Sequence, residues 1–220
     1  MLDSRFFAEE KAQMEREWAD HKTIIENFHP TPPIRIDFRE CMESKALRKL
    51  THTIDEHIIK GAKDFYIGID SPGGDSLATQ KAFLRFEGYQ ANGIRFSTHN
   101  LNLVASAAMK LFLAGQQRWS EERSRFFVHP PRGDGPPGNL GMQAECHLHM
   151  LTAFYALRSN INQQVWGAMC RRDTYISSEQ AVDMKVTHGI RAWNQVIHDR
   201  TVHIIHPEAV HEWKLDYSDQ

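Results

Sequence analysis

The chain has 220 residues, a length that suits one domain with or without an appended arm. Hydrophobic residues make up 41% of it, which is enough to build a buried core. Lys and Arg number 26 against 28 Asp and Glu, and the sequence pI is about 6.7. A nearly neutral chain lacks the basic field that attracts nucleic acid or an anionic membrane, so neither is expected as a partner.

The N-terminal segment, residues 1–33, is expected to form an arm separate from the main domain. Residues 5–27 are highly charged with a loose apolar stripe, which predicts a helix, and Pro30, Pro32 and Pro33 end it. No apolar stretch resembles a signal peptide or reaches the length of a membrane span. The three cysteines form no CxxC pair, so neither a disulfide framework nor a zinc site is indicated. These features favour a cytoplasmic protein.

Strands and helices alternate over residues 34–192. Predicted strands, marked by alternating or aromatic apolar residues, are 34–38, 65–69, 94–97 and 125–129. Predicted helices are 47–58, 77–86, an apolar segment at 105–114, a long helix at 139–170, and a short helix that begins with the capping box Ser177-Ser178-Glu179-Gln180. This alternation predicts an α/β layered fold with a mostly parallel sheet. Residues 193–220 would form a C-terminal extension.

A Pro-Gly-Gly turn, Ser71 to Gly74, follows the second predicted strand. Backbone N–H groups at such a turn can bind an oxyanion, because glycine lets a carbonyl oxygen come close to the main chain. Pro-Gly-Gly is also a common turn with no further role. Taken alone, this segment therefore indicates only a turn.

Three further residues have both an ordinary and a catalytic interpretation. Ser106 starts the apolar helix and would ordinarily be a cap. His129 ends an aromatic strand and would ordinarily be a hydrogen-bonded, half-buried histidine. Asp173 would ordinarily pair with the neighbouring arginines at the surface. Together they supply the nucleophile, base and orienting carboxylate of a serine hydrolase, with N–H donors at Gly74.

From residue 34 to residue 190 the sequence resembles the proteolytic subunit of the Clp protease. The resemblance rests on four stretches in the family's order: Ile69 to Gly74, Ala105-Ser106 with its apolar run to Gly115, Arg125 to Pro130, and Arg172 to Val182. It implies the crotonase-like fold of that family. It also implies that the long helix corresponds to the segment that joins two rings face to face.

The resemblance further implies a serine endopeptidase with the triad Ser106, His129 and Asp173. The oxyanion would be bound by the backbone N–H groups of Gly74 and Ala107. No cofactor and no metal are expected. The implied partners are peptide or unfolded-protein substrates and further copies of the chain in stacked rings. The N-terminal arm does not match the family segment that works with a ring ATPase of the AAA+ class, so such a partner is left open.

Several alternatives remain at this point. One is a catalytically inactive subunit with a structural role in the ring. Another is a crotonase-type acyl-CoA enzyme, which would use the N–H pair to polarise a thioester but has no need of the triad. A membrane-linked peptidase is disfavoured because no spanning segment is present. Finally, His203, His206 and His211 have a spacing that alone is weak evidence for a metal site.

Overall fold

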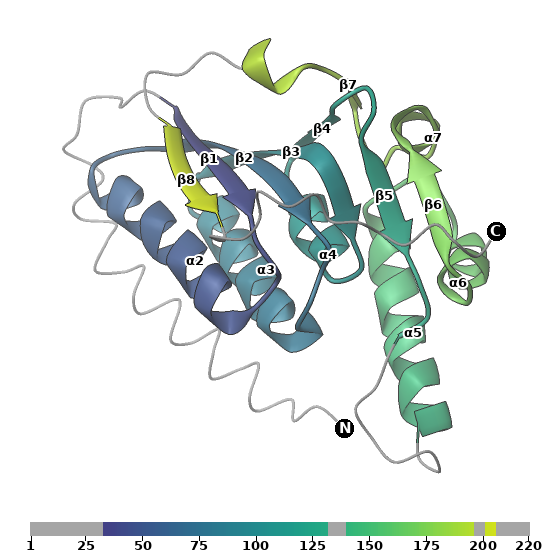
Figure 1. Ribbon diagram of the computed structural model, residues 1–220. Helices are drawn as coiled ribbons and strands as arrows, with labels where there is room; N and C mark the ends of the chain where they lie inside the picture. The colour runs from purple at the N-terminus through teal and green to yellow at the C-terminus, as the bar shows by residue number, and fades with distance from the viewer. Residues whose placement is uncertain (1–32, 132–139, 196–200, 206–220) are drawn as a thin grey trace.

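The computed structural model describes residues 33–131, 140–195 and 201–205 (Figure 1). The arm predicted over residues 5–27 lies outside the described residues. The strands are β1 (Ile34–Arg39), β2 (Asp64–Ser71), β3 (Arg95–Ala105), β4 (Gln117–Ser120), β5 (Arg125–Val128), β6 (Thr174–Ser177), β7 (Gly189–Ile190) and β8 (Thr201–Ile205). The helices are α2 (Ser44–Ile59), α3 (Ser76–Ala91), α4 (Ala108–Leu113), α5 (Leu140–Leu157), α6 (Gln163–Cys170) and α7 (Ser178–Asp183), with a 3-10 turn η1 (Trp193–Gln195).

The strands form one sheet in the order β6-β5-β3-β2-β1-β8, and β4 joins β3 to β7. Every pair is parallel except β5 with β6, which confirms the prediction of a mostly parallel sheet. The long strand β3 pairs with β4 through its first half and with β5 through its second half. The sheet therefore divides along β3, whose last residues lie between β5 and the end of β2, with Val104 paired to both Phe126 and Ser71.

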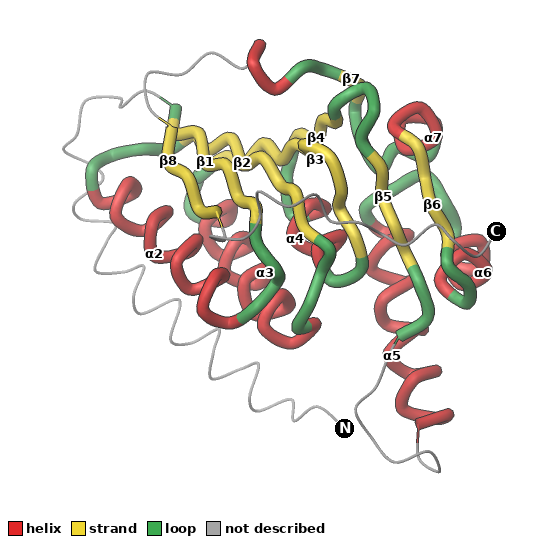
Figure 2. Tube along the Cα trace, in the orientation of Figure 1, coloured by secondary structure: helices red, strands yellow, loops and turns green. Residues whose placement is uncertain are grey.

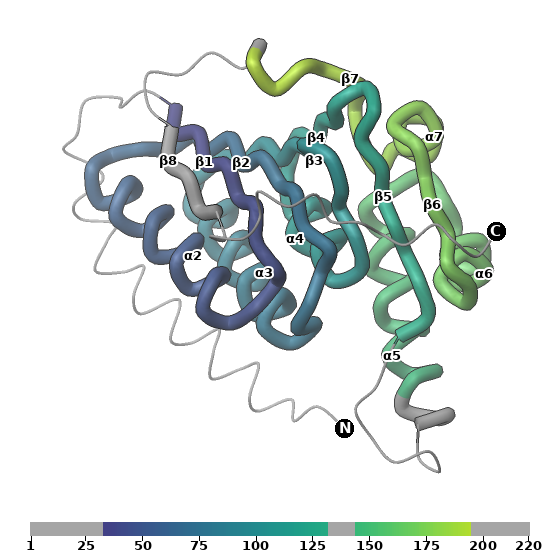
Figure 3. The backbone as a smooth tube through the Cα atoms, viewed as in Figure 1, coloured from purple at the N-terminus to yellow at the C-terminus, as the bar shows by residue number. Residues whose placement is uncertain are grey.

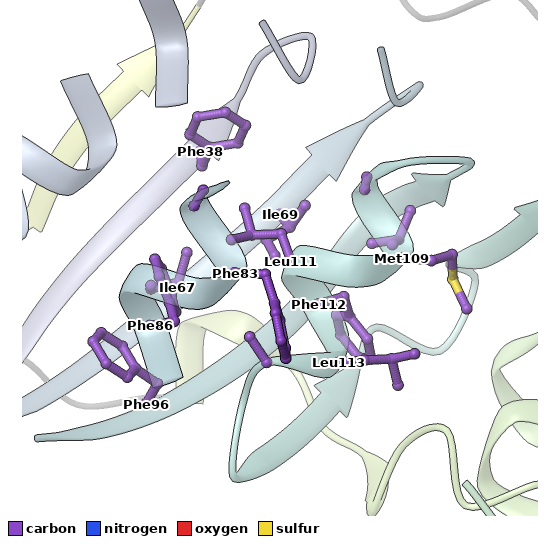
Figure 4. Packing of buried hydrophobic residues seen from close by; sticks show 14 of the residues in the cluster. Phe38, Ile67, Ile69, Phe83, Phe86, Phe96, Met109, Leu111, Phe112 and Leu113 are labelled. Carbon is purple, nitrogen blue, oxygen red and sulfur yellow. The ribbon is translucent and has the colours of Figure 1, made fainter. Parts of the chain in front are cut away.

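Helices α2, α3 and α4 lie on one face of the sheet, and their apolar sides pack on β1, β2 and β3 (Figure 2). Close packing of aromatic rings marks the centre of this layer, where Phe86 and Phe96 stack at 4.5 Å between centroids (Figure 4). All six residues of α4 are buried. Because cores pack at high density, the position of α4 and of the turn before it is tightly constrained.

The predicted strand over 94–97 and helix over 105–114 have wrong boundaries. β3 continues to Ala105 before the chain turns into α4 (Figure 3). The segment between them is rich in polar residues and looks like a loop, yet Asn100 is fully buried within the sheet. Its side-chain amide donates to the carbonyl oxygen of Arg125 at 2.9 Å. A neighbouring strand thus accepts a hydrogen bond from the side-chain nitrogen of a residue that the sequence alone assigns to solvent.

The single long helix predicted over 139–170 is also wrong, since α5 and α6 are separate. Between them the N–H of Asn160 donates to the carbonyl of Met184 at 2.9 Å. Asn162 then caps α6, its side chain accepting from the N–H of Val165 at 3.0 Å. Asparagine and serine offer such bonds in competition with the helix, whereas the apolar stripe continues across the break and hides it.

The C-terminal part contributes more than the expected extension. β8 lies at the sheet edge and pairs in parallel with β1, for example Ile36 with Val202. Trp193 is buried, and its indole N–H donates to Asp37 at 2.7 Å. The capping box predicted at Ser177 is confirmed, with Gln180 as its second member.

Candidate active site

Ser106 occupies the turn that joins β3 to α4. Its φ angle is +54°, a left-handed conformation that residues with side chains seldom adopt. The N–H of Ser106 donates to the carbonyl of Phe127 at 2.8 Å, which extends the ladder between β3 and β5 into the turn. Ser106 is not the cap of α4, because the N-cap is Ala107 and no side chain caps that helix. Strained positions of this kind are often functional.

The Pro-Gly-Gly turn packs directly against this serine. Gly73 has a φ of +94°, and a Cβ added there would lie 2.7 Å from the Cβ of Ser106 and 2.7 Å from the carbonyl oxygen of Ala105. No side chain fits at that distance. Glycine is therefore needed at position 73 both for its φ angle and for the close approach of the two turns.

His129 follows β5 and reaches Ser106. The Oγ of Ser106 lies 2.8 Å from Nε2 of His129, and both residues are half-buried. The other ring nitrogen, Nδ1, lies 2.7 Å from the carbonyl oxygen of Pro130. Because a carbonyl only accepts, this contact assigns the ring proton to Nδ1 and leaves Nε2 free to accept from the serine hydroxyl. This tautomer is the one that a general base requires.

Asp173 lies directly before β6. In the antiparallel pairing of β5 with β6, Val128 is opposite Thr174, so one further step along the register sets His129 opposite Asp173. The carboxylate is nevertheless exposed, and the two described residues share no hydrogen bond or ion pair. The structure therefore brings Ser106 and His129 together, and it places Asp173 across from His129 without joining their side chains.

Two backbone N–H groups near Ser106, those of Gly74 and Ala107, have no acceptor among the described residues. By contrast, the N–H of Gly73 donates to Oγ of Ser71 at 3.2 Å. Two hydrogen bonds with Met42 hold the residues on either side of Gly74. The N–H of Met42 donates to the Gly73 carbonyl at 2.8 Å, and the Met42 carbonyl accepts from the N–H of Asp75 at 2.9 Å. Rigid, unengaged N–H groups are the kind of donor that an oxyanion hole uses.

A model of the family described as Clp protease matches residues 44–190, well over half of the chain. The chain belongs to the Clp protease family. Among solved structures, a ClpP1 variant from Listeria monocytogenes is similar, with a TM-score of 0.64 at 17% identity over 73% of this chain and 92% of that chain. This likeness confirms the expected crotonase-like fold. No sequence among the curated proteins matches.

Sequence reasoning missed several groups beside the site of this Clp protease family member. The Pro130 carbonyl gave no signal, because any residue has one. The hydroxyl of Tyr155, on α5, lies 3.5 Å from the carbonyl oxygen of Ser106. Lys110 is buried in α4, and its Nζ donates to Oγ of Ser76 at 2.9 Å. A single charged residue within the otherwise apolar run was the available signal for Lys110.

In the parts of the chain that are described, no group of three His, Cys, Asp or Glu side chains is arranged to hold a metal ion. His206 and His211 lie outside the described residues, and for His203 only the backbone, in β8, is described. Within the same parts, no helix combines the length and the apolar character needed to cross a bilayer.

Proposed function

We propose that this Clp protease family member is a serine endopeptidase with Ser106 as nucleophile and His129 as general base. The observation that carries the proposal is the 2.8 Å contact between Oγ of Ser106 and Nε2 of His129. Two further facts support it. The backbone of Ser106 is held in a left-handed conformation, and Nδ1 of His129 carries the proton, so that Nε2 is the accepting nitrogen.

The proposed reaction begins with attack of the Ser106 hydroxyl on a peptide carbonyl carbon, while its proton passes to Nε2 of His129. The N–H groups of Gly74 and Ala107 donate to the oxyanion that forms. The imidazolium then gives its proton to the leaving amine, and an acyl-serine ester results. Water, deprotonated by His129, hydrolyses the ester and restores the Ser106 hydroxyl. This sequence balances without a metal or an organic cofactor.

Asp173 is proposed as the positioning residue of the triad. Its register opposite His129 supports this role. To act, its carboxylate has to replace the Pro130 carbonyl as the acceptor at Nδ1, which stabilises the imidazolium that forms during attack. Asp173 is thus the member of the proposed triad whose side chain has to move.

The proposal includes assembly into stacked rings of identical subunits that act on peptides or unfolded proteins. Family membership supports this, and so do large apolar side chains on α5 and α6 that remain exposed, with Met150 55%, Leu157 84% and Val165 44% exposed. Such groups are common at protein interfaces. An AAA+ partner is not included, because residues 1–32, the segment concerned, lie outside the described residues.

The test is labelling with a fluorophosphonate, which reacts preferentially with activated serine hydroxyls. The wild type is expected to label at Ser106, mapped by mass spectrometry, and Ser106→Ala and His129→Ala are expected not to label. Light scattering checks that each variant assembles as the wild type does. Absence of labelling in an intact assembly would favour a catalytically inactive ring subunit. Labelling at Ser76 instead of Ser106 would show that the assignment of Ser106 as nucleophile is wrong.

A further inference from the structure

Ser76, Lys110 and His147 form a second group of polar side chains, here called the lysine cluster. Lys110 Nζ donates to Ser76 Oγ at 2.9 Å, and the same oxygen lies 3.5 Å from Nε2 of His147. Ser76 lies in α3, Lys110 in α4 and His147 in α5, so the cluster links three helices. None of them has a part in the proposed triad or oxyanion hole.

The cluster borders the candidate active site. Lys110 lies one helical turn after Ser106, and Ser76 comes three residues after Gly73, whose backbone abuts Ser106. The bond between Ser76 and Lys110 therefore joins the same two chain segments as the contact between Gly73 and Ser106. Helix α5 also reaches both places, through His147 at the cluster and Tyr155 at the Ser106 carbonyl.

The charge of Lys110 is unusual for its surroundings. The side chain is 8% exposed, and its hydrogen-bond partner among the described residues is a neutral hydroxyl. No carboxylate of the described residues forms an ion pair with it. A buried ammonium group without a counter-charge is costly, and such groups are ordinarily paired.

The titration of the cluster leaves one positive charge in it near neutral pH. Burial lowers the pKa of Lys110 to about 8, so the ammonium form still predominates at pH 7. Burial, and then the charge of Lys110, lower the pKa of His147 from its ordinary value. Both effects favour the neutral form of the imidazole.

We propose that the lysine cluster binds a carboxylate of the substrate and so directs cleavage to a position beside an acidic group. The carboxylate supplies the missing counter-charge and accepts from the Lys110 ammonium, which has three donors and uses one on Ser76. Half-exposed Ser76 and His147 connect the buried ammonium to the surface. This inference rests on the proposed function, because it treats Ser106 as the neighbouring nucleophile.

The first test compares internally quenched peptides that are blocked at both ends and differ at one residue, Glu, Gln or Leu. The Glu peptide is expected to have a kcat/KM at least about tenfold above that of the Gln peptide, with the cut beside Glu. The carboxylate could belong to an acidic side chain or to the C-terminus of the peptide. A neutral peptide with a free C-terminus is therefore compared with the same peptide as its amide, and preference for the free form assigns the site to a terminal carboxylate. If neither pair of peptides shows a preference for the carboxylate, the proposal is overturned.

The second test removes the charge with Lys110→Met, which is expected to bring the Glu/Gln ratio to about one. The ratio is the readout, because it cancels any loss of folded enzyme. Lys49→Met, at an exposed lysine of α2, is the matched control and is expected to keep the wild-type ratio. If Lys110→Met does not fold, Lys110→Gln replaces it. An unchanged ratio in the folded variant overturns the assignment.

A binding measurement separates this inference from the proposed function. Ser106→Ala is titrated calorimetrically with the Glu and Gln peptides, which requires no turnover. Preferential binding of the Glu peptide, combined with a wild type that cleaves no peptide, would contradict the peptidase function and support the carboxylate site. Cleavage by the wild type without a carboxylate preference would contradict the carboxylate site alone. Neither binding nor cleavage would overturn both.

Discussion

Two serine hydroxyls in this molecule lie at nearly the same distance from a basic nitrogen, yet their surroundings differ. Ser106 Oγ is 2.8 Å from a ring nitrogen of His129, and Ser76 Oγ is 2.9 Å from Nζ of Lys110. Ser106 stands in a strained turn, whereas Ser76 is the first residue of α3. The nitrogen beside Ser106 accepts a proton, but a protonated lysine can only donate.

The comparison teaches that the length of a contact does not identify a nucleophile. The Pro130 carbonyl fixes the tautomer of His129 and makes Nε2 an acceptor. Burial alone does not remove the charge of Lys110 at neutral pH, since its pKa falls only to about 8. The first pair is therefore suited to proton transfer from serine, and the second to binding an anion.

The largest expected difference between the two pairs is in turnover. Ser106→Ala is expected to lower kcat/KM by about 10⁴-fold or more, because the covalent step is lost. Ser76→Ala, which removes one hydrogen bond to Lys110, is expected to lower it by less than about tenfold. Steady-state kinetics with a quenched peptide measures both. Comparable losses in the two variants would contradict the assignment of Ser106, and not Ser76, as the nucleophile.

The second largest effect is expected at Gly73, which packs against Ser106. Gly73→Ala is expected to destabilise the fold by about 2–4 kcal/mol, because it combines a left-handed backbone with a steric clash at Ser106. The control is Gly93→Ala, where φ is +84° but nothing lies within 4 Å, and strain alone costs about 1–2 kcal/mol. Urea denaturation measures both. Equal destabilisation would mean that the two turns do not need close contact.

Asp173→Asn tests how much the carboxylate contributes to the pair formed by Ser106 and His129. Because the Pro130 carbonyl already holds the correct tautomer, the expected loss in kcat is about 10- to 100-fold, or about 1.4–2.7 kcal/mol, with KM little changed. Kinetics of the folded variant checks the separation of kcat from KM. A loss near 10⁴-fold would mean that the carboxylate bonds His129 throughout turnover, and no loss would mean that Pro130 suffices.

The smallest expected effect is a pH dependence of the second pair. The Glu/Gln ratio in kcat/KM is expected to fall as pH rises through about 8, since kcat/KM reports the free enzyme and Lys110 loses its charge there. The groups facing it, the Ser76 hydroxyl from α3 and the neutral His147 from α5, do not replace that charge. A ratio that stays constant from pH 6 to 10 would contradict the prediction.

Stability is expected to change in the opposite direction. The folded state holds Lys110 at a pKa of about 8, below its ordinary value of 10.5, so between these values the unfolded chain binds more protons. The free energy of unfolding therefore gains a contribution from this group as pH rises through that window. Lys110→Met is expected to lose this contribution, which denaturation at pH 7.5 and 10 measures.

Local pattern predicted much of the fold. Alternating apolar residues predicted β1 and β2, and the Ser177 capping box marked the start of α7, because these signals depend on residues a few positions apart. The strands β4, β6, β7 and β8 were not predicted. Each is five residues or shorter, and each exists because a neighbouring strand accepts its hydrogen bonds.

By itself, then, the sequence determined the α/β alternation, the turn at Gly73 and, through its motifs, the expectation that Ser106 and His129 meet. Tertiary structure alone decided that β3 extends to Ala105, that the Pro130 carbonyl rather than Asp173 bonds His129, and that Lys110 reaches Ser76. The reason is physical: periodicity reports which face of an element is buried. Which groups meet across elements depends on sheet register and packing, which no single segment encodes.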